Sequence, residues 1–185
     1  GYITYGGKQI PVLWDVPAAP YNKDLFVRSG SRLYYNDPAY TTAWGIDVAR
    51  YQESIDWQKV AEAGLEFALI RVGGRFAESG ELYDDARFEE YLTGAKAAGL
   101  KTGVYFFSQA INTAEAVEAL YTIGKLNGRG LEYPVIFDWE IYSKTARSYG
   151  VDKNTLTDCA IAFCETVAQA GYTPMIYMGL EVGYT

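Results

Sequence analysis

The sequence predicts an α/β protein whose main domain is built on a parallel sheet. From position 44 onward, short apolar runs typical of buried strands alternate with longer runs whose apolar residues recur every three or four positions. Such repeats imply right-handed crossovers and a sheet covered on both faces, either open or closed into a barrel. The strands are short and no glycine-rich phosphate loop accompanies them, which favours the barrel.

The elements follow one another in a regular order. Asp56 can cap the first helix, which stops at Gly64, and Gly99 ends the second. The third helix begins near Thr113, and Asn154 or Thr155 can cap a fourth that stops at Gly171. We expect strands within 43–50, 66–74, 101–110, 133–140 and 173–179, and helices within 55–64, 84–100, 112–126 and 154–171.

Residues 1–43 differ in composition from the rest. They are rich in Tyr, Pro and Gly, and "SGS" at 29–31 indicates a turn between two strand-like pieces. We interpret this segment as an N-terminal arm or extension of the domain at 44–185. A small wall-binding module is the alternative, although 43 residues without a disulfide or metal would hardly fold alone.

Composition excludes several classes of function. The net charge of −7 would repel a phosphate backbone, so nucleic acid is not an expected partner. The chain has no His, which removes Ser-His-Asp and Cys-His catalysis and imidazole zinc sites. Cys159 and Cys164 are predicted to be reduced, packed thiols, and no apolar run is long enough to cross a bilayer.

Two acids end the fourth strand, in "YPVIFDWE". Alternate residues of a strand point to the same side about 6.5 Å apart, so Asp138 and Glu140 share a face and Trp139 lies on the other. At the mouth of a parallel sheet their repulsion would raise one pKa and leave one group a proton donor at neutral pH. A strand end with two solvated carboxylates is the alternative. Asp47 also ends a strand, which predicts three carboxylates at one rim.

Aromatic residues and one cation are expected around these acids. Tyr105 and Phe107 share a face of the third strand and Tyr177 closes the fifth, although each could be ordinary core packing. Arg71 sits at a strand end, where it can bind substrate or pair with one of these three carboxylates, and a structural ion pair is slightly favoured. Tyr51 is a further candidate for substrate contact.

Acids and aromatic residues at a sheet mouth, without His, a metal motif or a phosphate loop, indicate glycoside hydrolysis. In that chemistry, a carboxylic acid with a raised pKa protonates the leaving oxygen. We expect no cofactor and no metal.

Three motifs, "GIDVARYQESIDWQKVAEAGLEFALIRVGG", "GAKAAGLKTGVYFFSQA" and "YPVIFDWE", occur in the order and spacing typical of glycoside hydrolase family 25, the Chalaropsis-type lysozymes. The resemblance covers roughly residues 44 to 178. It implies a TIM-like (β/α) barrel with irregular helices that cleaves the β-1,4 bond between N-acetylmuramic acid and N-acetylglucosamine in peptidoglycan. Glu140 resembles the general acid, Asp138 its electrostatic partner, and Asp47 the acid of the first strand. The N-acetyl group of the substrate is the implied nucleophile, with retention of configuration.

Two departures from the family pattern stand out. Phe106 replaces a common His, and it is expected to face away from the sugar. The family's last strand carries another Asp at the rim, whereas this sequence ends at Thr185 before any such strand. The barrel is therefore expected to be incomplete at its C-terminal end, in either a truncated piece of a longer protein or a degenerate member.

Two other functions compete with a muramidase. One is an endo-hydrolase of chitin-like polymers, which shares the two-acid arrangement. The other is a glycan-binding protein without activity, although a pure binder has little reason to hold like charges together. A muramidase implies peptidoglycan strands as partner, a monomer, and an extracellular or cell-wall location.

Overall fold

The computed structural model describes residues 1–5, 7–12, 14–15, 17 and 19–179. The chain divides into two compact units, with the boundary between Ala43 and Trp44. None of the helices among the described residues is long and apolar enough to cross a membrane.

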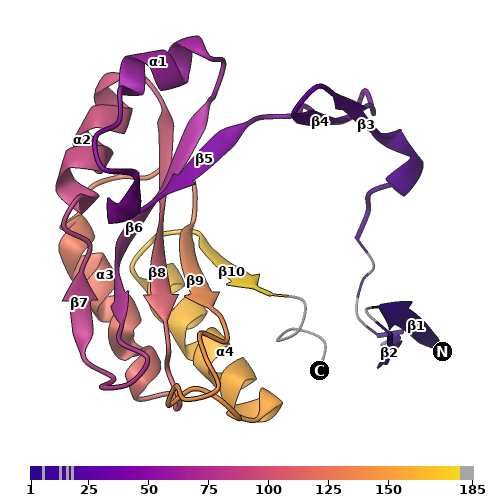
Figure 1. Ribbon diagram of the computed structural model, residues 1–185, viewed down its shortest axis with the longest axis vertical. Coiled ribbons are helices and arrows are strands. Elements are labelled where there is room, and N and C mark those ends of the chain that lie inside the picture. Colours follow the sequence, from indigo (N-terminus) through magenta and orange to yellow (C-terminus); the bar gives the residue numbers. More distant parts are fainter. Residues whose placement is uncertain (6, 13, 16, 18, 180–185) are drawn as a thin grey trace. The chain divides into compact units, whose positions relative to one another are not determined.

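The larger unit is organised on one sheet (Figure 1). Among the described residues, five strands pair in parallel in the order β10-β9-β8-β6-β5, and a sixth, β7, pairs antiparallel with β6. The strands are β5 (Gly45–Val48), β6 (Phe67–Arg75), β7 (Leu82–Asp84), β8 (Lys101–Ser108), β9 (Val135–Trp139) and β10 (Pro174–Met178).

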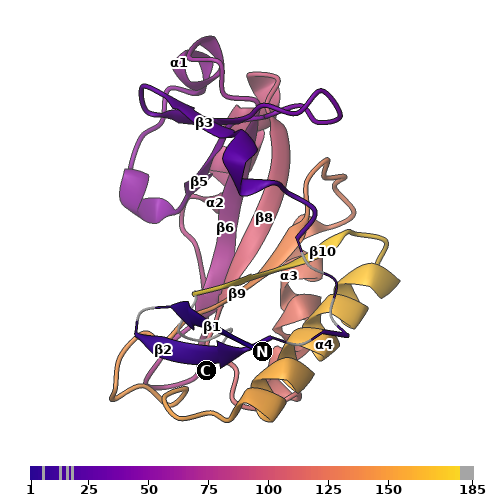
Figure 2. The ribbon, with the colours of Figure 1, turned by 90° about the vertical axis from the view of Figure 1, so that its right-hand side faces the viewer.

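The described helices of this unit cover only one face of the sheet (Figures 1 and 2). The expectation that both faces would be covered is therefore not met by these residues. The opposite face carries a mixture of charged, aromatic and apolar side chains. The helices are α1 (Trp57–Glu62), α2 (Phe88–Ala97), α3 (Glu118–Leu126) and α4 (Lys153–Gln169), with 3-10 turns η2 (Arg50–Gln52) and η3 (Glu115–Val117).

The core lies between the sheet and these helices. Alternate residues of each central strand point into it, as the period of a strand requires. On β9, the Phe137 ring packs against Phe163 of α4 with ring centroids 5.1 Å apart. On β8, Phe106 packs edge-on against Tyr121 of α3. Its side chain thus lies on the helix-covered face of the sheet, away from the opposite face, as expected from the sequence.

The N-terminal cap was predicted correctly for one helix and incorrectly for another. Asp56 caps α1 as predicted, accepting the backbone N–H of Lys59 at 3.2 Å. The prediction of Asn154 or Thr155 as the cap of α4 was wrong, because Asp152 accepts the backbone N–H groups of both, at 3.0 and 3.2 Å. The helix therefore starts earlier than its apolar period indicated.

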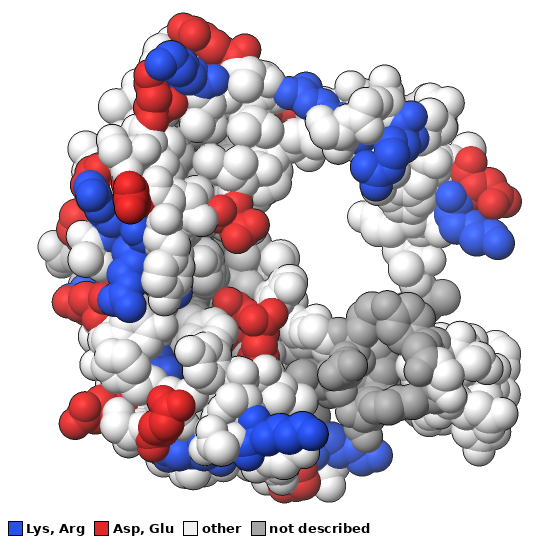
Figure 3. Space-filling model, in the orientation of Figure 1, with Lys and Arg blue, Asp and Glu red and all other residues white. Residues whose placement is uncertain are grey.

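Strand β7 was not predicted. It has three residues and folds back on β6, where Gly73 lets the two backbones approach closely. A Cβ built on Gly73 would lie 2.2 Å from the carbonyl oxygen of Tyr83, so a larger residue would push the strands apart. Charged side chains of both signs gather over α2, β7 and α3 (Figure 3), with ion pairs such as Lys125–Asp84 at 2.7 Å. Such exposed pairs contribute little to stability.

The smaller unit contains two antiparallel hairpins. The predicted turn at "SGS" joins β3 (Phe26–Ser29) to β4 (Arg32–Tyr35), preceded by a 3-10 turn, η1 (Lys23–Leu25). Strands β1 (Tyr2–Tyr5) and β2 (Lys8–Pro11) form the other hairpin. Tyr35 lies at the centre of an aromatic cluster, with ring centroids 4.9 to 5.3 Å from those of its three neighbours. These neighbours are Tyr21, Phe26 and Tyr40.

Replacing Phe163 should show how far β9 depends on α4. Phe163 is fully buried, so Phe163→Ala is expected to lower the free energy of unfolding by about 3–5 kcal/mol through lost contacts and a cavity. Ile161→Ala, on the exposed side of the same helix, should change it by less than about 0.5 kcal/mol. Urea denaturation measures both, and similar values for the two variants would contradict this packing.

Candidate active site

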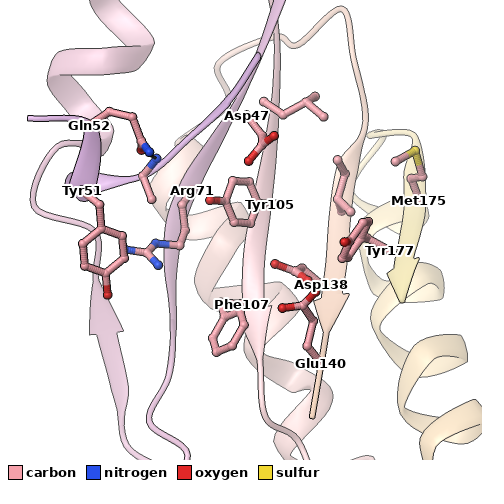
Figure 4. Close-up of a pocket in the computed structure, with 13 residues that line it drawn as sticks. Asp47, Tyr51, Gln52, Arg71, Tyr105, Phe107, Asp138, Glu140, Met175 and Tyr177 are labelled. Atoms are coloured by element: carbon pink, nitrogen blue, oxygen red, sulfur yellow. Dashed lines mark hydrogen bonds between the residues drawn. The ribbon is translucent and has the colours of Figure 1, made fainter. Parts of the chain in front are cut away.

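The uncovered face of the sheet carries a pocket of about 490 Å³ (Figure 4). A cavity of this size suits a small ligand or a short stretch of polymer. All eight side chains singled out from the sequence line it, together with five others. The lining residues are Asp47, Ala49, Tyr51, Gln52, Leu69, Arg71, Tyr105, Phe107, Ile136, Asp138, Glu140, Met175 and Tyr177.

Strand register brings these residues into rows. In the row nearest the strand ends, Asp138 of β9 pairs with Phe107 on one side and Tyr177 on the other. The next row joins Arg71 to Tyr105, then to Ile136 and Met175, and the row below pairs Asp47 with Leu69. Since neighbouring strands lie about 4.8 Å apart, residues of one row form a continuous wall.

Asp138 and Glu140 lie close together on this wall, as predicted from their spacing (Figure 4). Burial, together with the negative charges of Glu140 and Asp47 and against the opposing charge of Arg71, raises the pKa of Asp138 to about 7. The Oδ1 atom of Asp138 is buried and has no hydrogen-bond partner among the described residues. Asp138 therefore retains its proton up to about neutral pH, and its carboxyl group lines the pocket beside Glu140.

Trp139, between the two acids, faces the opposite way. Its side chain is buried and its indole N–H donates to the carbonyl oxygen of Ala110 at 2.9 Å. The alternation expected from the motif is therefore observed, with the acids toward the pocket and the tryptophan toward the core.

Asp47 lines the same pocket but does not adjoin the acid pair. It lies two rows from Asp138, with Tyr105 between them (Figure 4). Burial raises the pKa of Tyr105, and the charges of Asp47 and Asp138 contribute to this shift. The three carboxylates therefore share one site without direct contact between all of them.

Tyr177 stands beside Glu140 on the outer side of the pocket. Its side chain is half exposed, and the negative charge of Glu140 raises the pKa of its hydroxyl. On β8, on the other side of β9, the partly buried Phe107 packs edge-on against Tyr142 with centroids 6.4 Å apart. Rings on both sides of the acids could stack on sugar faces.

Arg71 is held by a structural ion pair, the alternative favoured from sequence. Its Nε donates to the buried carboxylate of Asp85 at 2.7 Å, so its partner is none of the three pocket acids. The guanidinium carbon lies 5.0 Å from the ring centroid of Tyr51. Hydrogen bonds to Arg50 and Arg71 lower the pKa of the Tyr51 hydroxyl. Arg71 thus joins the pocket with its charge already paired.

Sequence reasoning missed the apolar part of the lining. Leu69, Ile136 and Met175 each lie two residues before a predicted site residue on the same strand, namely Arg71, Asp138 and Tyr177. The period of two could have identified them, because residues i and i−2 of a strand share a face. Among the described residues, no group of three His, Cys, Asp or Glu side chains is placed to hold a metal ion.

Replacing Asp138 should alter how stability depends on pH. The pKa of Asp138 is raised from 3.8 to about 7, so the folded state binds more protons than the unfolded state between these values, and stability falls as pH rises through this window. We therefore compare the free energy of unfolding of Asp138→Asn with that of wild type. The variant's value relative to wild type should be about 1–3 kcal/mol higher at pH 8 than at pH 4. Urea denaturation at both pH values measures this, with the exposed Asp158→Asn as control. If the difference in free energy of unfolding between Asp138→Asn and wild type were the same at both pH values, the raised pKa of Asp138 would be contradicted.

Comparison with known proteins identifies relatives of the larger unit. Lysozyme M1 of Streptomyces globisporus is 33% identical over 110 residues, which are 58% of this chain and 36% of that relative. N,O-diacetylmuramidase of Chalaropsis sp is 28% identical over 146 residues, 74% of this chain and 65% of that protein. This chain thus spans about a third of the length of the first relative.

A solved structure shows the same fold. A family 25 glycosyl hydrolase from Bacillus anthracis superposes with a TM-score of 0.64 at 20% identity, over 84% of this chain and 68% of that one. The sequence profile described as Glycosyl hydrolases family 25 matches residues 46–184, which is most of the chain. The chain belongs to glycosyl hydrolases family 25.

Proposed function

We propose that this protein hydrolyses the β-1,4 bond between N-acetylmuramic acid and N-acetylglucosamine in peptidoglycan, with Glu140 as general acid. The observation that carries the proposal is the placement of Asp138, whose pKa is raised to about 7, beside Glu140 in the pocket of a family 25 chain. Relatives named as lysozyme and N,O-diacetylmuramidase support this substrate.

The acid pair can divide the work of the first step. Asp138 lines the pocket, where its carboxylate can accept the N–H of the substrate's acetamido group. Hydrogen bonding to a carboxylate favours its ionised form, so substrate binding would move the shared proton from Asp138 to Glu140. Glu140 then gives this proton to the glycosidic oxygen as the bond from that oxygen to C1 breaks.

The acetamido group supplies the nucleophile in this mechanism. Its carbonyl oxygen bonds to C1, and the resulting oxazolinium ion carries a positive charge that Asp138 stabilises. Water then attacks C1 and gives a proton to the Glu140 carboxylate, which breaks the bond to the acetamido oxygen and restores both groups. Two displacements at C1 retain the anomeric configuration.

The remaining pocket residues would hold the glycan. Tyr105, Phe107 and Tyr177 surround the acid pair and can contact sugar rings, while Asp47 can accept hydroxyl hydrogen bonds one row beyond Tyr105. Tyr51 is exposed over Arg71 at the other end of the pocket. No cofactor takes part in this mechanism.

We also propose a TIM-like barrel for the whole catalytic domain. Within the described sheet, β5 pairs only with β6 and β10 only with β9, so each has one unpaired edge of backbone groups. Further strands pairing with these edges would close the sheet around the pocket. Such a domain, with residues 1–43 as an extension, would act as a monomer on bacterial walls outside the cell, where peptidoglycan lies.

Digestion of purified peptidoglycan tests the activity. Wild type should release ends that become reduced muramic acid after borohydride treatment, identified by mass spectrometry. Glu140→Gln should lower the rate by about 10²–10⁴-fold because it cannot donate a proton. Glu165→Gln, an exposed glutamate of α4, should act like wild type. Reduced glucosamine ends, or bound glycan without cleavage, would count against a muramidase.

The stereochemistry tests the role of the acetamido group. Proton NMR of a short glycan digest should show the β-anomer of the new reducing end first, followed by mutarotation, because two displacements retain configuration. Asp138→Asn should slow the formation of this product without changing its anomer. An α-anomer appearing first would rule out the substrate-assisted route.

A further inference from the structure

The position of Glu140 raises a structural question, because it lies just beyond the end of β9. The last residue of that strand is Trp139, and the pairing of β9 with both neighbours ends there. The backbone of Glu140 is therefore not held by the ladder that fixes Asp138. A general acid needs a fixed direction, since a displacement of about 1 Å can cost about 100-fold in rate.

One buried side chain provides the missing constraint. The Nε2 of Gln109 donates to the backbone carbonyl oxygen of Glu140 at 2.8 Å and to that of Ser108 at 2.9 Å. Its Oε1 accepts the hydroxyl of Ser148 at 2.5 Å. Gln109 is fully buried and Ser148 is 1% exposed, so no solvent competes for these bonds. Both amide hydrogens and the amide oxygen of Gln109 therefore take part in hydrogen bonds.

The bridge connects three separate segments. Ser108 ends β8, Glu140 follows β9, and Ser148 belongs to the loop that leads from Glu140 to α4. The same region also holds the residue before Glu140, since the indole of Trp139 donates to Ala110. Residues 108–110 thus contact the side chain of Trp139 and the backbone of Glu140.

We propose that Gln109 is a positioning residue for Glu140, with Ser148 orienting the Gln109 amide; this inference rests on the proposed hydrolase function. Fixing the carbonyl of Glu140 fixes the peptide plane on one side of its Cα, and the end of β9 fixes the other. The Cα–Cβ bond then points into the pocket beside Asp138. Gln109 itself is fully buried and is not one of the residues that line the pocket.

The chemistry of the site requires an amide at this position. A carboxylate would present only acceptors to two carbonyl oxygens, and an apolar chain would leave both carbonyls without a donor. The hydroxyl of Ser148 selects the orientation, because it donates to the amide oxygen and leaves the nitrogen facing the carbonyls.

Kinetics of matched variants test this proposal. Gln109→Met keeps the length of the side chain without its hydrogen bonds, and it should lower kcat by about 10–100-fold with KM within about threefold of wild type. Ser148→Ala should have a smaller effect in the same direction, and Ser148→Thr, which keeps the hydroxyl, should restore most of the activity. Thr122→Val is the control, since it removes another buried bond, from the Thr122 hydroxyl to the carbonyl of Glu118, away from the pocket.

A purely structural role predicts a different result. In that case, Gln109→Met and Thr122→Val would both lower the melting temperature while leaving kcat of the folded protein unchanged, which would overturn the proposal. An inactive wild type would instead refute the proposed function, and this inference with it.

A measurement without turnover gives an independent check. Carboxyl carbon NMR of the wild-type protein follows the titration of Asp138 and Glu140. Gln109→Met should shift these titrations because the distance between the two acids changes, whereas Thr122→Val should not. Unchanged titrations in Gln109→Met would contradict positioning even if that variant were too unstable for kinetics.

Discussion

The parallel pairing of β5, β6, β8, β9 and β10 in one register is the constraint on which the rest of this structure depends. It places Phe107, Asp138 and Tyr177 side by side and puts Arg71 and Tyr105 one row away. Because side chains alternate between faces, a slip of one residue in β9 would bury Asp138 and expose Phe137 and Trp139. The same pairing therefore determines both the core and the pocket.

The core offsets the cost of placing acids on a partly desolvated wall. Asp138 lies between Phe137 and Trp139, which are both almost fully buried on the helix side. Burial and neighbouring negative charge both disfavour its ionised form, so this part of β9 is held in place by packing and not by the acid itself. Such a conflict between local stability and chemistry is typical of functional sites.

Local patterns predicted much of this arrangement, and contacts between distant segments account for what was missed. Periodicity predicted the five parallel strands, the shared face of Asp138 and Glu140, and the position of Phe106 on the face away from these acids. The partner of Arg71 could not be predicted, because Asp85 comes next to it only through the turn into α2. Gln109 was missed for the same reason, since its bonds join three segments. The uncovered face was not predicted either, because the placement of the helices depends on contacts between segments distant in the sequence.

A single proton connects the stability of the site with its chemistry. Below about pH 7 Asp138 retains its proton, which reduces repulsion in the folded state and, in the proposed mechanism, supplies the proton that the leaving oxygen requires. Above that pH Asp138 becomes charged, so the folded state loses stability and, in the proposed mechanism, the proton donor is lost. In the proposed mechanism, binding of an acetamido group has a different effect, because its N–H would stabilise ionised Asp138 and the proton would pass to Glu140. The position of Glu140 would then decide whether that proton reaches the glycosidic oxygen.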